Sequence, residues 1–381
     1  MDDNDNIKQL EKELGISLKR ETIKHYFIIN IGCLMNGDIC EGINLDKLKL
    51  KELPKSISNF TNLNFLSVQD NEISDLSPIS ELTNLKHLIF CRNQITNIDL
   101  LSGLKFLTDI DFSENQISDI NSIHHLKYLE SLDLSGNLIS NIEPLVKLRN
   151  LRYLSLRRNQ LESIEPLSFL FKLEELKLWG NRITDITVLA NLKSLINLSI
   201  GENQIKDFGS LRELSKLTEL DLSVLDLEDI SFLKWNTNLI SLYLWMNKIK
   251  DISPIINLNK LKVLYLFRNQ ISDISVIRNL KELNQLELDS NKIITLPDWI
   301  VDIGLNINAS ILFDGFIFTI DYSKREIVYL KSNITNIKNI NSLANNSLKL
   351  DSLVTNIDIK NSIITSNINN KSQITNGKNI Y

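Results

Sequence analysis

The chain has 381 residues, of which 43% are hydrophobic and 23% are charged, and this is a globular composition. The formal net charge of −5 argues against nucleic acid as the main partner, because phosphate binding needs a basic surface. No window approaches the roughly 18 consecutive apolar residues of a membrane span, so we expect no membrane partner.

The beginning of the chain does not resemble a secretory signal. The only candidate for its apolar core is residues 26–35, which lies late, is short and contains Asn30. A cytoplasmic protein is therefore the expectation. The cysteines Cys33, Cys40 and Cys91 form a sparse, odd-numbered set. Cys33 and Cys40 could bridge in an oxidising compartment, but reduced thiols are favoured, because intracellular proteins rarely keep disulfides.

The first predicted elements are a helix and a hairpin. Residues 5–14 have the apolar spacing of a short amphipathic helix, and Gly15 is its predicted end. Residues 26–31 and 39–45 are predicted strands around the turn at Asn36-Gly37. These elements are most simply a cap over the exposed end of a repeat array.

An asparagine then recurs every 22 residues without insertion or deletion. The positions that carry it are Asn71, Asn93, Asn115, Asn137, Asn159, Asn181, Asn203, Asn247, Asn269 and Asn291. Leu225 stands at the one exception, between Asn203 and Asn247. Apolar residues keep the same period, and the consensus reads LxxLxxLxLxxNxIxDIxxL. Such regularity indicates a repeat architecture.

This pattern is that of a leucine-rich repeat, and it covers residues 45–297. The 22-residue variant, with phrases such as Asn93-Gln94-Ile95-Thr96-Asn97-Ile98, resembles bacterial internalins. It also resembles the eukaryotic regulatory subunit of protein phosphatase 1 that shares this repeat length. The resemblance implies a right-handed superhelix and recognition of a protein partner.

The residues support the same fold independently. The alternation LxL predicts a short strand with one face inward, and successive strands must pair in parallel because the chain always turns the same way. Apolar residues three apart predict 3₁₀ or extended segments on the opposite wall. Prolines at one register of that wall fit this backbone, namely Pro78, Pro144, Pro166 and Pro254. We therefore expect an α/β-type solenoid with a parallel concave β-sheet and short 3₁₀ or extended convex segments.

The expected organisation has four parts: an N-terminal cap at 1–44, the repeats at 45–297, a C-terminal cap at 298–330 and a tail rich in Asn, Ile and Ser at 331–381. A short helix is predicted at 297–303 and a hairpin at 311–321. The composition of the tail does not decide between irregular strands and disorder.

The repeated polar residues are interpreted as structural. An inward asparagine can satisfy the backbone groups of the turn after each strand, so we expect a small irregularity at 223–227, where Leu225 replaces it. A second column, of aspartates in the turn after each strand, could be mistaken for an array of calcium ligands. Asn and Ser stand at the same position in other repeats, and this mixture favours capping of the turn. Its aspartates are Asp119, Asp185, Asp207, Asp229, Asp251 and Asp273. The pair His124-His125 is expected to be solvated rather than a metal site.

Specificity must come from the variable positions between the strand leucines, which point out of the concave face. Aromatic and basic residues gather there: Tyr153, Arg157, Arg158, Lys177, Trp179, Tyr243, Trp245, Tyr265, Phe267 and Arg268. Small residues between them predict a depression at Ser199, Gly201, Asp221 and Ser223. The N-terminal half is expected to carry an acidic zone at Asp109, Asp111, Glu114 and Asp133.

These observations predict a non-catalytic scaffold that binds a protein partner through its concave face. No cofactor, metal or small-molecule substrate is indicated, and no arrangement of acid, base and nucleophile is recognisable. One alternative is a regulatory subunit that controls a partner enzyme such as a phosphatase. Another is an internalin-like adhesin, which the missing secretory signal disfavours.

Overall fold

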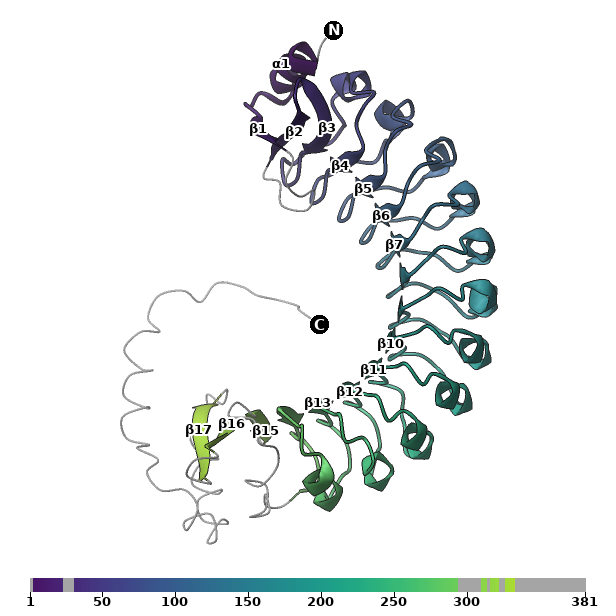
Figure 1. Cartoon of the computed structure of the whole chain (residues 1–381), viewed down its shortest axis with the longest axis vertical. Helices are drawn as coiled ribbons and strands as arrows, with labels where there is room; N and C mark the ends of the chain where they lie inside the picture. The colour runs from purple at the N-terminus through teal and green to yellow at the C-terminus, as the bar shows by residue number, and fades with distance from the viewer. Residues whose placement is uncertain (1–2, 23–30, 294–309, 314–315, 322–325, 333–381) are drawn as a thin grey trace.

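The computed structural model describes residues 3–22, 31–293, 310–313, 316–321 and 326–332. The chain forms a curved solenoid with one strand and one short 3₁₀ helix per turn (Figure 1). The strands line the inner, concave side and the 3₁₀ helices line the outer, convex side. This is the predicted leucine-rich-repeat solenoid.

The elements of the described chain follow one another regularly. The first are α1 (Asp3–Leu14), β1 (Lys19–Thr22), β2 (Gly32–Asn36) and β3 (Ile39–Asn44). The strands of the repeats are β4 (Phe65–Ser67), β5 (His87–Ile89), β6 (Asp109–Asp111), β7 (Ser131–Asp133), β8 (Tyr153–Ser155), β9 (Glu175–Lys177), β10 (Asn197–Ser199), β11 (Glu219–Asp221), β12 (Ser241–Tyr243), β13 (Val263–Tyr265) and β14 (Gln285–Glu287). The last strands are β15 (Ser310–Phe313), β16 (Phe316–Asp321) and β17 (Glu326–Ser332).

The convex side consists of 3₁₀ helices, as the apolar spacing predicted. They are η1 (Lys55–Asn59), η2 (Ser77–Ile79), η3 (Asp99–Gly103), η4 (Asn121–His125), η5 (Glu143–Lys147), η6 (Glu165–Phe169), η7 (Thr187–Asn191), η8 (Gly209–Glu213), η9 (Ser231–Trp235), η10 (Ser253–Ile255) and η11 (Ser275–Asn279). The four prolines lie in the first turn of η2, η5, η6 and η10, where a missing N–H breaks no hydrogen bond. No helix in the described ranges is long and apolar enough to cross a membrane.

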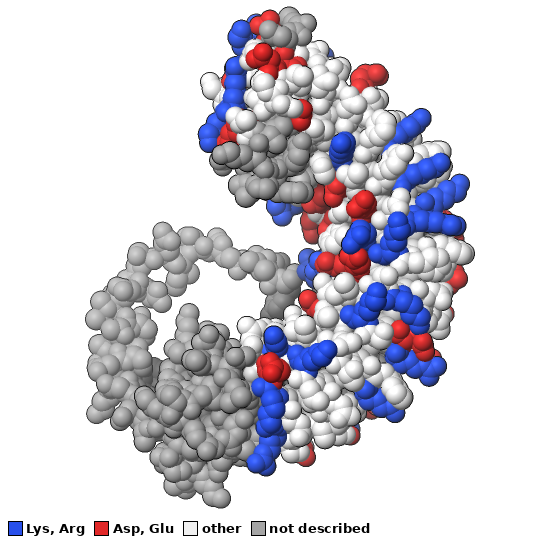
Figure 2. All heavy atoms as spheres, in the orientation of Figure 1, with Lys and Arg blue, Asp and Glu red and all other residues white. Residues whose placement is uncertain are grey.

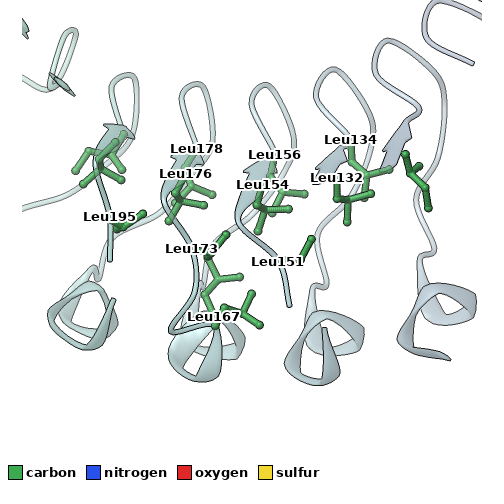
Figure 3. Close-up of a cluster of buried hydrophobic side chains, with 14 of the residues drawn as sticks. Leu132, Leu134, Leu151, Leu154, Leu156, Leu167, Leu173, Leu176, Leu178 and Leu195 are labelled. Carbon is green, nitrogen blue, oxygen red and sulfur yellow. The ribbon is translucent and has the colours of Figure 1, made fainter. Parts of the chain in front are cut away.

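The strands from β3 to β15 pair in parallel in one sheet, each with its sequence neighbours. Residues 22 apart stand opposite each other, as Leu242 does to Leu264. The leucines of strands and of 3₁₀ helices point into the same interior, so every turn adds a layer to one continuous core (Figure 3). Leu154, Leu167 and Leu176 are fully buried there.

Each aspartate of the predicted capping column starts a 3₁₀ helix. The carboxylate of Asp273 accepts a hydrogen bond from the Ser275 amide at 2.8 Å, and that of Asp185 does so from the Thr187 amide at 2.8 Å. These bonds direct the chain from the edge of the sheet into the next helix. The capping interpretation is thus confirmed.

The asparagine column connects consecutive turns. The Asn159 amide nitrogen donates to the Leu134 carbonyl at 2.9 Å and to the Leu156 carbonyl at 3.2 Å. Its amide oxygen accepts from the Ile139 amide at 2.9 Å. One buried side chain therefore satisfies backbone groups of two turns, which confirms its structural role.

The turn before each asparagine carries a left-handed residue. The non-glycine members of this row are Asp70, Arg92, Glu114, Arg158, Glu202, Val224, Met246, Arg268 and Ser290. Val224, with φ of 57°, is the one β-branched member among them. A branched Cβ is poorly tolerated in that region, so this turn is strained.

The same turn holds the predicted irregularity. Without an asparagine at 225, the Asn247 amide oxygen accepts from both the Leu225 and the Leu227 amides, at 3.0 Å each. Asp226 also adopts a left-handed φ of 56°, which no other described repeat shows at this position. The amides equivalent to that of Ile205 donate to an asparagine twenty residues later, as the Ile183 amide does to Asn203, and for Ile205 that position is held by Leu225.

The N-terminal cap differs from its prediction in two places. The helix begins at Asp3 rather than residue 5, and it packs on η1, where the Ser56 amide donates to a Glu13 carboxylate oxygen at 3.2 Å. The first hairpin strand was predicted at 26–31, whose residues 26–30 lie outside the described residues. Among the described residues, the strand before the Asn36-Gly37 turn is β2, which begins at Gly32 and pairs antiparallel with β3.

At the other end, β15 and β16 form the predicted antiparallel hairpin, and β17 extends it. The predicted helix at 297–303 and the tail from residue 333 onward lie outside the described residues.

The asparagine column predicts opposite effects for two substitutions. Asn159→Leu removes partners from buried backbone groups and should lower the free energy of unfolding by about 1–3 kcal/mol. Leu225→Asn offers an acceptor to the Ile205 amide and should raise that free energy. Denaturant unfolding of both variants beside the wild type measures the two changes, and equal destabilisation would contradict the bridging role.

The strained turn gives a second prediction. Val224→Gly should raise the free energy of unfolding by about 1 kcal/mol, because relief of roughly 1–2 kcal/mol of left-handed strain exceeds the entropy that glycine loses. The matched control is Val263→Gly in β13, where glycine should destabilise. Thermal unfolding of the two variants should show midpoint shifts of opposite sign.

Candidate functional site

All ten predicted site residues lie on the concave strands or directly after them, and all are partly or largely exposed. They form two groups. The first, here called the aromatic cluster, is Tyr243, Trp245, Tyr265 and Phe267 on β12 and β13, with Arg268 beside it. The second, the cationic cluster, is Tyr153, Arg157, Arg158, Lys177 and Trp179 on β8 and β9.

The aromatic cluster is produced by the register of the sheet. Tyr243 pairs with Tyr265 across two strands, and their ring centroids lie 5.2 Å apart at 76°. Two residues further on, Trp245 and Phe267 stack at 5.3 Å with an interplanar angle of 3°. The Arg268 guanidinium lies 3.7 Å from the Met246 sulfur and continues the row. The result is a wall of four half-buried rings with their outer surfaces open.

The cationic cluster is held by ring–cation contacts. The guanidinium carbons of Arg157 and Arg158 lie 5.6 Å and 5.5 Å from the Trp179 ring. The Lys177 ammonium lies 5.1 Å from the Tyr153 ring and 2.7 Å from a Glu175 carboxylate oxygen. Two guanidiniums beside one indole place positive charge and a flat apolar surface at the same spot.

The depression predicted between the clusters is partly filled. Gly201 is buried and Ser223 is fully buried. The Trp179 indole leans over them, since a Cβ added to Gly201 would lie 2.6 Å from Trp179 Cδ1. The predicted depression is therefore closed at Gly201 and Ser223, because a large neighbouring side chain occupies the space that the glycine leaves, whereas Ser199 and Asp221 stay partly exposed.

A depression of about 430 Å³ lies beside Trp179 instead. Its lining includes Arg158, Trp179, Arg182 and Glu202. Sequence reasoning missed Arg182 and Glu202, since both lie in the turns after their strands rather than on the strands themselves. They could have been found by comparing the turn residues of successive repeats, which recur with the same 22-residue period as the strand residues.

The acidic zone of the N-terminal half is present on the concave side (Figure 2). Carboxylates of this zone accept hydrogen bonds from neighbouring residues. Asp133 accepts a hydrogen bond from the Tyr153 hydroxyl at 3.0 Å, and Asp111 accepts one from the Ser113 amide at 2.9 Å. Burial, together with the nearby Asp133 carboxylate, raises the pKa of Tyr153, which stays protonated and joins the acidic zone to the cationic cluster. No group of three or more His, Cys, Asp or Glu residues suited to a metal ion occurs in the described ranges.

Comparison with known proteins agrees with this geometry. The family model described as Leucine Rich repeats (2 copies) matches residues 83–128, 127–169, 171–213 and 237–279. The unmatched stretch 214–236 contains Leu225 and its irregular turn. The comparison with curated proteins gives no match.

Solved structures show the same solenoid. An internalin from Listeria monocytogenes is 32% identical, with a TM-score of 0.66 over 72% of this chain and 80% of that one. A leucine-rich-repeat protein from Leptospira interrogans is 25% identical, with a TM-score of 0.63 over 72% and 78%. The Arabidopsis receptor kinase HAESA, solved with a peptide hormone and a co-receptor, is 23% identical, with a TM-score of 0.62 over 72% and 50%, and shows the fold alone.

Two carboxylates predict opposite pH effects on stability. Burial and the Asp289 carboxylate raise the pKa of Glu287, so its charged form is disfavoured in the folded state. Bonds from the Ser275 amide and hydroxyl lower the pKa of Asp273, so its charged form is favoured. At pH 7, Glu287→Gln should therefore raise the unfolding midpoint and Asp273→Asn should lower it.

The Glu287 difference should shrink as the pH falls through its raised folded pKa and vanish below its unfolded pKa, whereas the Asp273 difference should be lost as the pH falls through its lowered folded pKa. Thermal unfolding between pH 3 and pH 7, in roughly one-unit steps, measures them. Shifts of the same sign at pH 7 would contradict this assignment.

Proposed function

Because this chain belongs to the leucine-rich-repeat family, we propose that it is a non-catalytic scaffold that binds a protein partner through its concave face. Proteins with this repeat fold typically bind proteins or peptides and are usually non-catalytic. The finer proposal is that the aromatic cluster and the cationic cluster together form the binding surface.

The observation that carries the proposal is the aromatic cluster. The Trp245–Phe267 stack and the Tyr243–Tyr265 pair lie side by side on adjacent strands, with part of each ring exposed. A wall of rigid rings gives a partner a large apolar area with little loss of side-chain entropy. Exposed rings grouped in this way are typical of binding sites rather than of ordinary surface.

The cationic cluster restricts the orientation in which a partner can bind. Arg158 and Arg182 line the depression beside Trp179, and the Arg157 guanidinium lies near the same indole. Guanidinium groups bind carboxylates in a fixed geometry. The partner surface that fits both clusters has apolar side chains near β12 and β13 and acidic side chains near β8 and β9.

We place this activity in the cytoplasm. The support for this proposal is the sparse, odd-numbered set of three cysteines, which is poorly suited to a disulfide framework. A regulatory role toward an enzyme such as a phosphatase and an internalin-like adhesive role are the alternatives. Both would use the same face, so the identity of the captured partner decides between them.

The test is selection of peptides from a random display library on the full chain. The winning peptides should lose affinity for a Tyr243→Ala, Trp245→Ala, Phe267→Ala variant. Each ring that acts as an anchor should contribute about 1–4 kcal/mol, so the combined loss should exceed tenfold. Titration of a synthetic peptide against both proteins measures it.

The matched control is Trp235→Ala with Ile256→Ala, which removes exposed apolar side chains from the convex side. This variant should bind the peptide as the wild type does. Unfolding midpoints establish that each variant is folded. Equal binding by the wild type and the concave variant would refute the aromatic cluster as the site.

A further inference from the structure

The convex side of the solenoid carries a second surface that the concave function does not use. It lies at the ends of η3–η6 and in the turns that follow them. Its cations are Lys105, Lys127, Lys147 and Arg149, and its rings are Phe106, Tyr128, Phe169 and Phe171. All eight side chains are exposed, and they are called the basic stripe here. Figure 2 shows lysine and arginine side chains gathered on this side of the repeats.

The rings of the basic stripe protrude instead of filling a groove. Tyr128 is 58% exposed and Phe171 is 54% exposed. Phe106 stacks on Tyr128 of the next turn at 6.3 Å, and Phe169 meets Phe171 edge-on at 6.4 Å. The Arg149 guanidinium lies 5.8 Å from the Phe169 ring. Apolar rings on an outwardly curved surface are unfavourable in water unless something covers them.

The charge of the stripe has one sign. Within the described residues, none of its four cations forms an ion pair with a carboxylate. Lys105, Lys127 and Arg149 stand 22 residues apart, at the same position of three consecutive turns, so their charges lie in one column of the stripe. Such a surface attracts anions, although the whole chain is negative.

We propose that the basic stripe docks this protein peripherally on an anionic phospholipid surface, with its rings at the level of the headgroups and its cations on the lipid phosphates and carboxylates. Juxtaposed basic and aromatic side chains are the groups that favour this interface. The concave face points the other way, so both surfaces can be occupied together (Figure 1).

Two other occupants fit the geometry less well. A single-stranded nucleic acid would stack its bases on open ring faces, but Phe106 and Tyr128 already cover each other's facing sides. A folded acidic protein would need a hollow that matches separately protruding rings, whereas the soft bilayer interface accommodates them. The inference revises our expectation of no membrane partner, which rested on the lack of an apolar segment long enough to span a membrane.

The test is co-sedimentation of the full chain with vesicles of phosphatidylcholine alone or with about 30% phosphatidylserine, at low and high salt. Binding should require phosphatidylserine and weaken with salt. Lys105→Glu with Lys127→Glu should reduce the partition coefficient at least about thirtyfold. Phe106→Ala with Tyr128→Ala should reduce it about tenfold and leave the salt dependence unchanged.

The matched control is Lys216→Glu with Lys281→Glu, which changes two exposed lysines in the turns after η8 and η11, outside the stripe; Lys281 has the repeat position of Lys105, and Lys216 lies one position later. This control variant should bind vesicles as the wild type does. The concave Tyr243→Ala, Trp245→Ala, Phe267→Ala variant should also bind vesicles normally, so failure of this proposal can be distinguished from failure of the concave function. The proposal is overturned if the chain binds neutral vesicles as well as anionic ones, or if the stripe and control variants lose equal affinity. It is also overturned if the chain binds oligothymidine or polyglutamate but not vesicles.

Discussion

The structure depends on the buried asparagine that ties each turn of the chain to the one before it. Its amide group satisfies backbone donors and acceptors of two consecutive turns, as Asn159 does for Leu134 and Ile139. Backbone groups that would be orphaned inside the core are thereby paired, and the position of each turn relative to its neighbour is fixed. Side chains 22 residues apart consequently become contact neighbours, and both candidate surfaces are made from such neighbours.

The variable positions of the repeats, which take no part in this framework, hold the side chains of both candidate surfaces. On the concave side they hold a ring wall at β12 and β13 and guanidiniums around Trp179 at β9. On the convex side they hold the basic stripe between η3 and η6. The two sides face opposite directions, so recognition of a partner and attachment to a surface need not compete. The irregular turn at Val224–Asp226 lies between the two concave clusters, where a missing asparagine loosens the otherwise uniform stacking.

The sequence by itself determined the repeat length, the parallel register, the 3₁₀ wall, the aspartate caps and the position of the irregular turn. It also determined that Tyr243, Trp245, Tyr265 and Phe267 would share one wall, because neighbours on a sheet follow from register alone. Only the tertiary structure decided where side chains lean and which charges meet. Trp179 fills the space over Gly201, and the exposed lysines at 105, 127 and 147 form no ion pair with a carboxylate of the described residues, in a chain of net negative charge. The physical reason is that a period specifies backbone neighbours, whereas rotamers and local charge depend on several side chains packing at once.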